Sequence, residues 1–247
     1  MTIREFFREH PKLALAFSGG VDSAYLLHAA MDCGADVRPY CAFTPFQPAF
    51  EREEAEAFCR LLGTELTAVE VPLLEAEAVA ANPSDRCYHC KRLLLGAIRT
   101  RALADGYPLL ADGTNASDDA SDRPGMRALS EAGVLSPLRL CALTKDEIRR
   151  LSREAGLPTW DKPAYACLAT RIPTGERITP ALLRRVEDAE AALRALGYSD
   201  LRVRVFHGAA RIQLPKAQLR GAGGNAEAIV NAVKPCFNVV MLDLEGR

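Results

Sequence analysis

Three cysteines offer the most specific chemistry in this sequence. Cys87 and Cys90 form a C-x-x-C pair, which places two thiols on one turn of a helix, where they can share a metal ion or form a disulfide. A helix that begins near Cys87, together with Lys91 and Arg92, favours the thiolate form. Cys167 lies in a distant loop. If the fold brings it to the pair, three thiolates can bind a 4Fe-4S cluster and leave one iron open to carry a labile sulfide.

Three other interpretations of these cysteines stay open. Cys87 and Cys90 alone can form a redox disulfide. The same pair can share a structural zinc ion with Cys167 and His89. The thiols can also be unrelated to one another. The remaining cysteines, which stand singly in apolar contexts where core packing is the default for a free thiol, are Cys33, Cys41, Cys59, Cys141 and Cys236.

The second candidate site is a glycine turn, SGGVDS at 18–23, between an apolar strand predicted at 13–17 and a helical stretch at 24–31. The two adjacent glycines let the backbone turn sharply and leave no Cβ in the way of a ligand. Their amides, together with the positive end of the following helix, form an anion site. We expect Ser23 to cap this helix and to donate to a phosphate.

This turn is neither a Walker loop, which needs Gly-Lys-Ser/Thr, nor the G-x-G-x-x-G dinucleotide fingerprint. It resembles the PP-loop of the ATP pyrophosphatases, SGGxDS, which bind ATP and split it between the α- and β-phosphates. The resemblance implies that Asp22 holds Mg²⁺ against the pyrophosphate, and the alternative is an ordinary strand-to-helix turn. The residues that it assigns to ATP binding are Ser18, Gly19, Gly20, Asp22 and Ser23.

Two further stretches are candidates for nucleotide binding. The strand predicted at 109–111 runs into DGTN at 112–115, at the strand end where open α/β sheets bind ligands, which makes Gly113 a candidate. Arg123, at the start of a helix predicted at 124–132, is a candidate for holding a phosphate or a carboxylate. An ordinary N-terminal turn accounts for Arg123 equally well.

Near the C-terminus, Arg202 and Arg204 alternate along a predicted strand, so both point to the same face. Arg211 can join them from the partner strand, across a turn at His207-Gly208. Neighbouring guanidinium groups repel one another unless an anion lies between them, so we expect a phosphate or carboxylate ligand here. The solvated face of an edge hairpin is the alternative.

The chain as a whole has an ordinary globular composition. Of its 247 residues, 49% are hydrophobic and 26% are charged, and the formal net charge of −1 argues against a nucleic acid partner. No apolar run approaches the length of a transmembrane helix, and no signal peptide is evident. The eight cysteines are therefore expected to be reduced thiols or ligands in a cytoplasmic protein without a membrane partner.

Strands and helices alternate along the first part of the chain, which predicts an α/β fold, a parallel sheet with helices on both faces. Strands are expected at 13–17, 37–43, 66–71 and 109–111, and helices at 24–31, 49–62, 73–81, 88–104, 124–132 and 145–155. After a segment without regular period at 160–179, helices are expected at 180–196 and 226–233, and strands at 201–206, 210–214 and 237–242. We therefore predict a PP-loop ATP-binding domain at 1–160 and a smaller α/β domain at 161–247.

Together these segments resemble the LarE family, ATP-dependent sulfur transferases of the PP-loop superfamily that build the nickel-pincer cofactor of lactate racemase. SGGVDS is common to the superfamily, whereas the cysteine motif and the CLATRIP segment select this family. The resemblance runs from Leu13 to about Leu244 and rests on SGGVDS at 18–23, DRCYHCK at 85–91, ADGTNASD at 111–118, RPGMRA at 123–128, SPL at 136–138, ACLATRIPTGERIT at 166–179 and the arginine hairpin.

The resemblance implies an activity. ATP adenylates a carboxylate of a pyridinium-3,5-dicarboxylate mononucleotide and releases pyrophosphate, and sulfur then displaces AMP to leave a thiocarboxylate. Some family members sacrifice the sulfur of one cysteine, at the position of Cys167, whereas others hold a 4Fe-4S cluster with three. Because Cys87, Cys90 and Cys167 are all present, we expect these three to bind the cluster and, with Asp22, to form the catalytic set.

The resemblance also implies a homo-oligomer, a trimer or a hexamer formed through the second domain. Gln213 stands where the family usually has glutamate, which puts a metal or base role there in doubt, and the stretch 242–247 is shorter than family tails. The sulfur donor is not identified by the sequence. The alternatives in other classes are a tRNA thiolase, an amidating synthetase similar to NAD synthetase, and a nucleotide sensor without catalysis that a zinc ion stabilises.

Overall fold

The computed structural model describes residues 1–118 and 123–247, without the side chains of 123 and 124. The chain separates into two compact units. The first consists of Met1–Thr44, Ala49–Leu73 and Asp85–Ala164, and the second of Pro45–Pro48, Leu74–Ser84 and Tyr165–Arg247. Neither unit is a continuous stretch of chain, and the division between 160 and 161 stays a prediction about domains.

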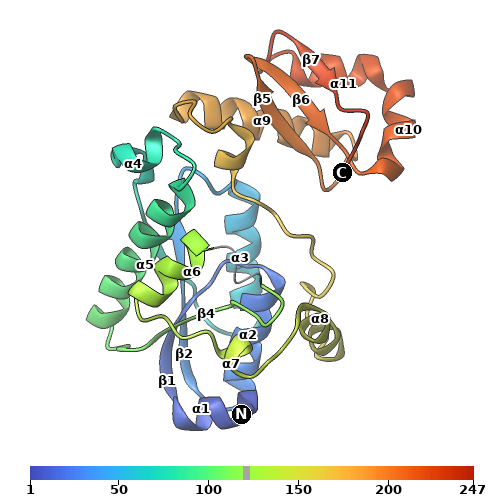
Figure 1. Ribbon diagram of the computed structural model, residues 1–247. Coiled ribbons are helices and arrows are strands. Elements are labelled where there is room, and N and C mark those ends of the chain that lie inside the picture. Colours follow the sequence, from blue (N-terminus) through green and yellow to red (C-terminus); the bar gives the residue numbers. More distant parts are fainter. Residues whose placement is uncertain (119–122) are drawn as a thin grey trace. The chain divides into compact units, whose positions relative to one another are not determined.

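The first unit is built on a parallel four-stranded sheet with the order β3-β2-β1-β4 (Figure 1). The strands are β1 (Lys12–Ala16), β2 (Asp36–Phe43), β3 (Thr67–Glu70) and β4 (Leu110–Asp112). Ala16 at the end of β1 lies opposite both Tyr40 and Asp112. Since the chain leaves β1 towards β2 and returns to its other side as β4, the ends of β1 and β4 flank the position where such sheets bind ligands.

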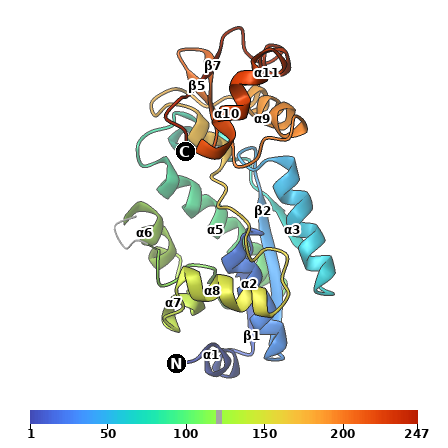
Figure 2. The same ribbon diagram turned by 90° about the vertical axis from the view of Figure 1, so that its right-hand side faces the viewer.

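Helices cover both faces of this sheet, as the alternation predicted (Figure 2). One face is packed by α2, α3 and α8, and the other by α5 and α6. The bounds are α1 (Ile3–Glu9), α2 (Val21–Asp32), α3 (Ala49–Leu61), α5 (Arg86–Ala104), α6 (Arg123–Glu131), α7 (Pro137–Leu140) and α8 (Lys145–Glu154). The short helix η1 (Leu73–Glu75) starts in the first unit at Leu73 and its other two residues belong to the second. No helix within the described residues is both long and apolar enough to cross a membrane.

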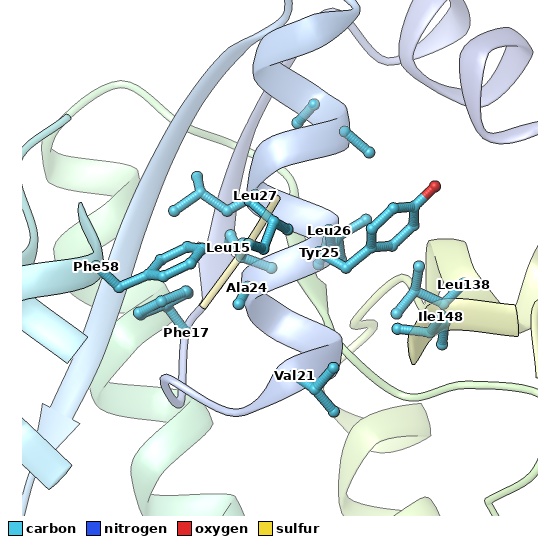
Figure 3. Close-up of a cluster of buried hydrophobic side chains, with 14 of the residues drawn as sticks. Leu15, Phe17, Val21, Ala24, Tyr25, Leu26, Leu27, Phe58, Leu138 and Ile148 are labelled. Atoms are coloured by element: carbon cyan, nitrogen blue, oxygen red, sulfur yellow. The ribbon is translucent and has the colours of Figure 1, made fainter. Parts of the chain in front are cut away.

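The core of this unit surrounds α2 (Figure 3). Phe17, directly after β1, stacks on Phe58 of α3 with the ring centroids 6.0 Å apart. Leu138 and Ile148 pack against the same cluster and are fully buried. Burying each such side chain stabilises the fold by about 1.5–3 kcal/mol. These contacts hold α2, α3 and α8 around the turn that follows β1.

The second unit has a three-stranded sheet with the order β5-β6-β7, in which β5 and β6 are antiparallel and β7 runs parallel to β6. Thr179 caps α9 by accepting a hydrogen bond from the backbone of Leu182, with Pro180 in the first turn, as predicted. The elements are α4 (Glu77–Ala80), η2 (Leu168–Arg171), α9 (Pro180–Ala195), β5 (Arg202–Phe206), β6 (Ala209–Gln213), α10 (Lys216–Gly224), α11 (Ala226–Val233) and β7 (Val240–Leu242).

Several elements differ from the sequence-based expectation. The single helix predicted at 73–81 is interrupted because Ala76 is extended, with φ −86° and ψ 111°, between η1 and α4. The helix α10 was not predicted, since three of its residues are glycines that lower helix propensity. The short helices α7 and η2 were also missed, and the last strand begins at Val240 rather than at 237.

Candidate functional site

The turn between β1 and α2 leaves the start of the helix open to a ligand. Gly20 is the N-cap of α2 in extended backbone (φ −81°, ψ 168°), and no side chain among the described residues caps the helix. Gly19 has a φ of +72°, and a Cβ at this position would lie 3.1 Å from the Cβ of Ala55 on α3. Glycine is therefore required by both conformation and space. The amides of the first turn of α2 have no acceptor within the helix, so they and its positive end are available to an anion.

Ser23 does not cap α2, contrary to the prediction, because the helix begins earlier and Gly20 occupies the cap position. Ser23 lies inside the first turn and is buried. Its hydroxyl donates to the carbonyl of Gly20 (3.2 Å) and accepts from the backbone N–H of Ser18 (3.3 Å). Ser23 thus stabilises the turn from within, whereas Ser18 is exposed.

Asp22, on the first turn of α2, forms an ion pair that the sequence did not predict. Its Oδ2 lies 2.6 Å from Nζ of Lys145, with the side chains 22% and 33% exposed, respectively. Its Oδ1 is buried and has no hydrogen-bond partner among the described residues. Leaving a buried acceptor unsatisfied costs about 1–3 kcal/mol. This oxygen suits a cation or a donor that arrives with the ligand, and Mg²⁺ binding by Asp22 stays a prediction.

A pocket of about 550 Å³ adjoins the turn. It is lined by Gly19, by one face of α3 and by the stretch 158–162. Nζ of Lys162 donates to the carbonyl of Gly19 (3.0 Å) and pairs with Glu54 (2.7 Å). The buried hydroxyl of Thr159 has no partner within the described part of the chain. The pocket therefore brings an amine and a hydroxyl to the surroundings of the glycine turn.

The loop after β4 packs directly on the start of α2. A Cβ on Gly113 would lie 2.9 Å from the backbone nitrogen of Ser23, so only glycine fits. The carboxylate of Asp112 accepts a hydrogen bond from the hydroxyl of Thr114, which fixes the loop. The structure thus brings Gly113 to the glycine turn, as expected for the end of a strand next to β1. Arg123 is the first residue of α6, but its side chain lies outside the described residues.

Cys87 and Cys90 lie on the first turn of α5, as the C-x-x-C spacing predicted. Cys87 is exposed and Cys90 is buried, and Nη2 of Arg86 lies 3.6 Å from the sulfur of Cys87. Asp85 lies 3.2 Å from His89. None of the eight cysteines, all of which are described, forms a disulfide. Within 1–118 and 123–247, no three His, Cys, Asp or Glu side chains gather to hold a metal ion.

Cys167 belongs to the second unit, where it is half-buried at the N-cap of η2. The segment is held by the fully buried guanidinium of Arg171, which donates to the carbonyl of Ala166 (2.9 Å) and pairs with Glu190 (2.8 Å). Glu190 also accepts the hydroxyl of Tyr165. Because Cys167 and the C-x-x-C pair belong to different units, the three-cysteine set stays a prediction.

The arginines of β5 lie as the alternation predicted. Arg202 and Arg204 share one face, and the register places Arg211 of β6 directly opposite Arg204. Burial lowers the pKa of both Arg202 and Arg204, and neighbouring guanidinium groups lower it further. Arg211 is neutralised by Asp243 at 2.7 Å. The face therefore carries crowded positive charge that an anion would stabilise.

Gln213 bridges this arginine face to a carboxylate. Its Oε1 accepts from Nε of Arg204 (2.7 Å), and its Nε2 donates to Oδ2 of Asp243 (2.8 Å). A glutamate at this position would repel Asp243, whereas the amide can bond to both neighbours. The carboxylate absent from 213 is thus present nearby, on the strand-end residue Asp243.

Sequence reasoning missed Lys145, Lys162, Arg171 and Glu190. Each acts through a partner far along the chain, which no local pattern reveals. Lys145 was visible only as the first residue of a capping-box helix, a motif that the structure confirms through Thr144 and Glu147. Arg171 was quoted as part of a motif, without a role.

Comparison with known proteins gives relatives over nearly the whole chain, although no family model matches it. An uncharacterized protein of Synechocystis is 39% identical over 99% of this chain and 92% of its own length. The pyridinium-3,5-bisthiocarboxylic acid mononucleotide synthase of Lactiplantibacillus plantarum is 31% identical over 88% of this chain and 80% of that enzyme. The tRNA-specific 2-thiouridylase MnmA of Thermotoga petrophila is 27% identical over 59% of this chain and 52% of its own length.

Proposed function

Because the chain belongs to the LarE family, we propose that it converts carboxylates of a pyridinium-3,5-dicarboxylate mononucleotide to thiocarboxylates in nickel-pincer cofactor biosynthesis. It is an ATP-dependent sulfur transferase with a PP-loop fold. The observation that carries the proposal is the open start of α2, where Asp22 keeps one buried oxygen without a partner among the described residues.

In the first step, a carboxylate oxygen of the substrate attacks the α-phosphorus of ATP. The bond between the α-phosphorus and the bridging oxygen to the β-phosphate breaks, and pyrophosphate leaves with the electron pair. The amides of the first turn of α2 and the positive end of this helix would bind the departing charge. Oδ1 of Asp22 would hold Mg²⁺, which neutralises charge on pyrophosphate when bound. The acyl adenylate that remains has AMP as a good leaving group.

The substrate is a mononucleotide, so it needs a phosphate site besides the ATP site. Arg202 and Arg204 supply one, because two guanidinium groups on one strand face match a phosphate dianion. Gln213 and the carbonyl of Thr170 fix Arg204 through hydrogen bonds of 2.7 Å and 2.6 Å. Because residue 213 is the neutral Gln213 and not a glutamate, it does not neutralise the positive charge that this face offers to the substrate.

Sulfur then replaces AMP on the acyl carbon. The residues that would hold a 4Fe-4S cluster are Cys87, Cys90 and Cys167, a donor set of thiols whose first two members share one helical turn. When bound, the cluster supplies a labile sulfide. Arg86 places a positive charge beside Cys87, with its Nη2 3.6 Å from the sulfur. The alternative within the family is that Cys167 gives up its own sulfur and becomes dehydroalanine.

The proposal is tested by incubating the anaerobically reconstituted protein with ATP, Mg²⁺ and the dicarboxylate mononucleotide. We expect pyrophosphate release together with a thiocarboxylate product detected by mass. Asp22→Ala should abolish pyrophosphate release in a protein that remains folded. A colourless, iron-free protein would contradict the cluster, and a loss of the mass of H₂S at Cys167 would establish the sacrificial route instead.

The likeness to the 2-thiouridylases keeps tRNA thiolation as the second candidate. The chain spans about half the length of that relative, and its net charge of −1 provides no overall attraction to a polyanion. Tight tRNA binding with a steep salt dependence would favour the thiolase. We also propose that the protein is a trimer or a hexamer, which light scattering decides.

A further inference from the structure

Lys145 is a charged residue whose position next to the glycine turn calls for an explanation. It is the first residue of α8, yet its Nζ reaches Oδ2 of Asp22 on α2 at 2.6 Å. The contact joins residues far apart in the sequence, and the side chain of Lys145 is only 33% exposed. A lysine that only solvated the surface would extend into water, because ordering its long side chain costs conformational entropy.

The position of Lys145 is fixed from several sides. The capping box of Thr144 and Glu147 sets the start of α8, and the backbone N–H of Lys145 donates to the hydroxyl of Ser117 in the loop after β4 (2.9 Å). Ile148, one turn further along, is fully buried in the core around α2 (Figure 3). Lys145 is therefore held in α8, bonded to the loop after β4 and paired with α2 through Asp22.

The two carboxylate oxygens of Asp22 have different surroundings. Lys145 holds Oδ2, whereas Oδ1 is buried and without a hydrogen-bond partner in the described part of the chain. A carboxylate that is free to rotate would expose both oxygens to water in turn. Holding one of them by a charge-assisted hydrogen bond fixes the direction in which the other faces.

We propose that Lys145 is a positioning residue for adenylation, which holds Asp22 so that Oδ1 receives the cation that accompanies pyrophosphate. The inference rests on the proposed function, because it assumes that the glycine turn binds ATP with Mg²⁺. It assigns Lys145 an action through Asp22 rather than a contact of its own with the phosphates. Removing either member of the pair should then have nearly the same effect, and removing both should add little.

The experiment is a double-mutant cycle read by calorimetric binding of Mg²⁺-pyrophosphate to the full chain. Lys145→Met and Asp22→Asn should each weaken binding ~10- to 100-fold, the range for losing a hydrogen bond to a charged group. The double variant should be no weaker than the weaker single variant. Effects that multiply would overturn the proposal, because Lys145 would then contact the phosphates independently.

The matched control is Lys216→Met, which removes another lysine from the first position of a helix, in the second unit. It should bind Mg²⁺-pyrophosphate as the wild type does. Lys145→Gln provides a second neutral variant if Lys145→Met does not fold. If the wild type binds Mg²⁺-pyrophosphate and the Lys145 variants bind it with the same affinity, the inference about Lys145 is overturned and the proposed function is not. Absence of binding of both Mg²⁺-ATP and Mg²⁺-pyrophosphate by the wild type would overturn the proposed function and the inference with it.

Discussion

The two units each contain a carboxylate paired with a cation, and the two pairs differ in how completely they are satisfied. In the second unit, Glu190 and Arg171 are 1% and 0% exposed, and Glu190 also accepts from Tyr165 and from the backbone of Val203. In the first unit, Asp22 and Lys145 are partly exposed, and one oxygen of Asp22 has no partner among the described residues. The Glu190 pair of the second unit is satisfied by the protein itself, whereas the Asp22 pair of the first unit leaves one buried oxygen for a ligand to satisfy.

This difference separates a structural role from a functional one. The network around Glu190 connects α9 to the segment of Cys167 and to β5, which carries the arginine face. It fixes candidate residues without being in the site itself. Asp22 lies at the candidate site, and its side-chain partner among the described residues is Lys145. Substitutions in the Glu190 pair should therefore lower the stability of the fold, whereas substitutions in the Asp22 pair should lower the activity.

The largest expected effect is on stability, at Glu190. Glu190→Gln removes the charge that neutralises the fully buried Arg171, and leaving a buried charge unpaired costs about 3–5 kcal/mol of unfolding free energy. Urea unfolding measures it. The control Glu154→Gln breaks an exposed pair with Arg150 on α8 and should change stability by less than about 1 kcal/mol. Equal losses of stability in Glu190→Gln and Glu154→Gln would show that the buried pair is not a special structural contact.

A smaller loss of stability is expected where the loop after β4 meets α2. Gly113→Ala places a Cβ 2.9 Å from the backbone nitrogen of Ser23, which cannot move without shifting the helix. Such overpacking costs about 1–3 kcal/mol, and ATP binding should weaken with it. Gly96→Ala is the control, because that position on α5 has open space and alanine favours helices. A tolerated Gly113→Ala in thermal unfolding would contradict the close packing.

Asp22→Asn should lower the activity and leave the stability nearly unchanged. A partly exposed ion pair contributes about 1 kcal/mol or less to stability, so the unfolding free energy should hardly change. Pyrophosphate release should nevertheless stop, because asparagine lacks the charge that a cation requires. The unfolding free energy and the rate of pyrophosphate release should be measured on the same preparation of the variant. A variant that loses several kcal/mol of stability would show that Asp22 is structural.

The smallest expected effect concerns pH. The hydrogen bond from Gln213 lowers the pKa of Asp243 below its usual value of 3.8. A carboxylate with a lowered pKa stabilises the fold above its unfolded pKa, and this stabilisation is lost as the pH falls through the folded value. The difference in unfolding free energy between wild type and Asp243→Asn should therefore shrink as the pH falls below about 3.8. A difference independent of pH would contradict the assignment.

Sequence patterns located the parts of the candidate site whose chemistry is local. Glycines at 19 and 20 predicted the turn, strand alternation predicted a shared face for Arg202 and Arg204, and the thiol spacing predicted one helical turn. The parallel sheet followed from the order of elements and is confirmed.

Contacts between distant segments were beyond such patterns. Nothing near Lys145 indicates that its amine reaches Asp22, because that contact depends on how α8 packs beside α2. The cap of α2 was assigned to Ser23 instead of Gly20, since an oxygen-bearing side chain is the usual cap and glycine gives no such signal. Where a helix begins is decided by the turn before it.

The discontinuous second unit has a consequence for how the protein is made. Its early segments are hydrogen-bonded to much later ones, with the N–H of Leu168 donating to Phe46 and that of Ile178 donating to Ala80, at 2.9 Å and 2.8 Å. A ribosome that synthesises the chain in order releases the early segments of this unit, Pro45–Pro48 and Leu74–Ser84, long before their partners exist. The unit can therefore form only after the nascent chain has grown beyond Ile178, because chains that end near 160 lack the N–H donors of Leu168 and Ile178.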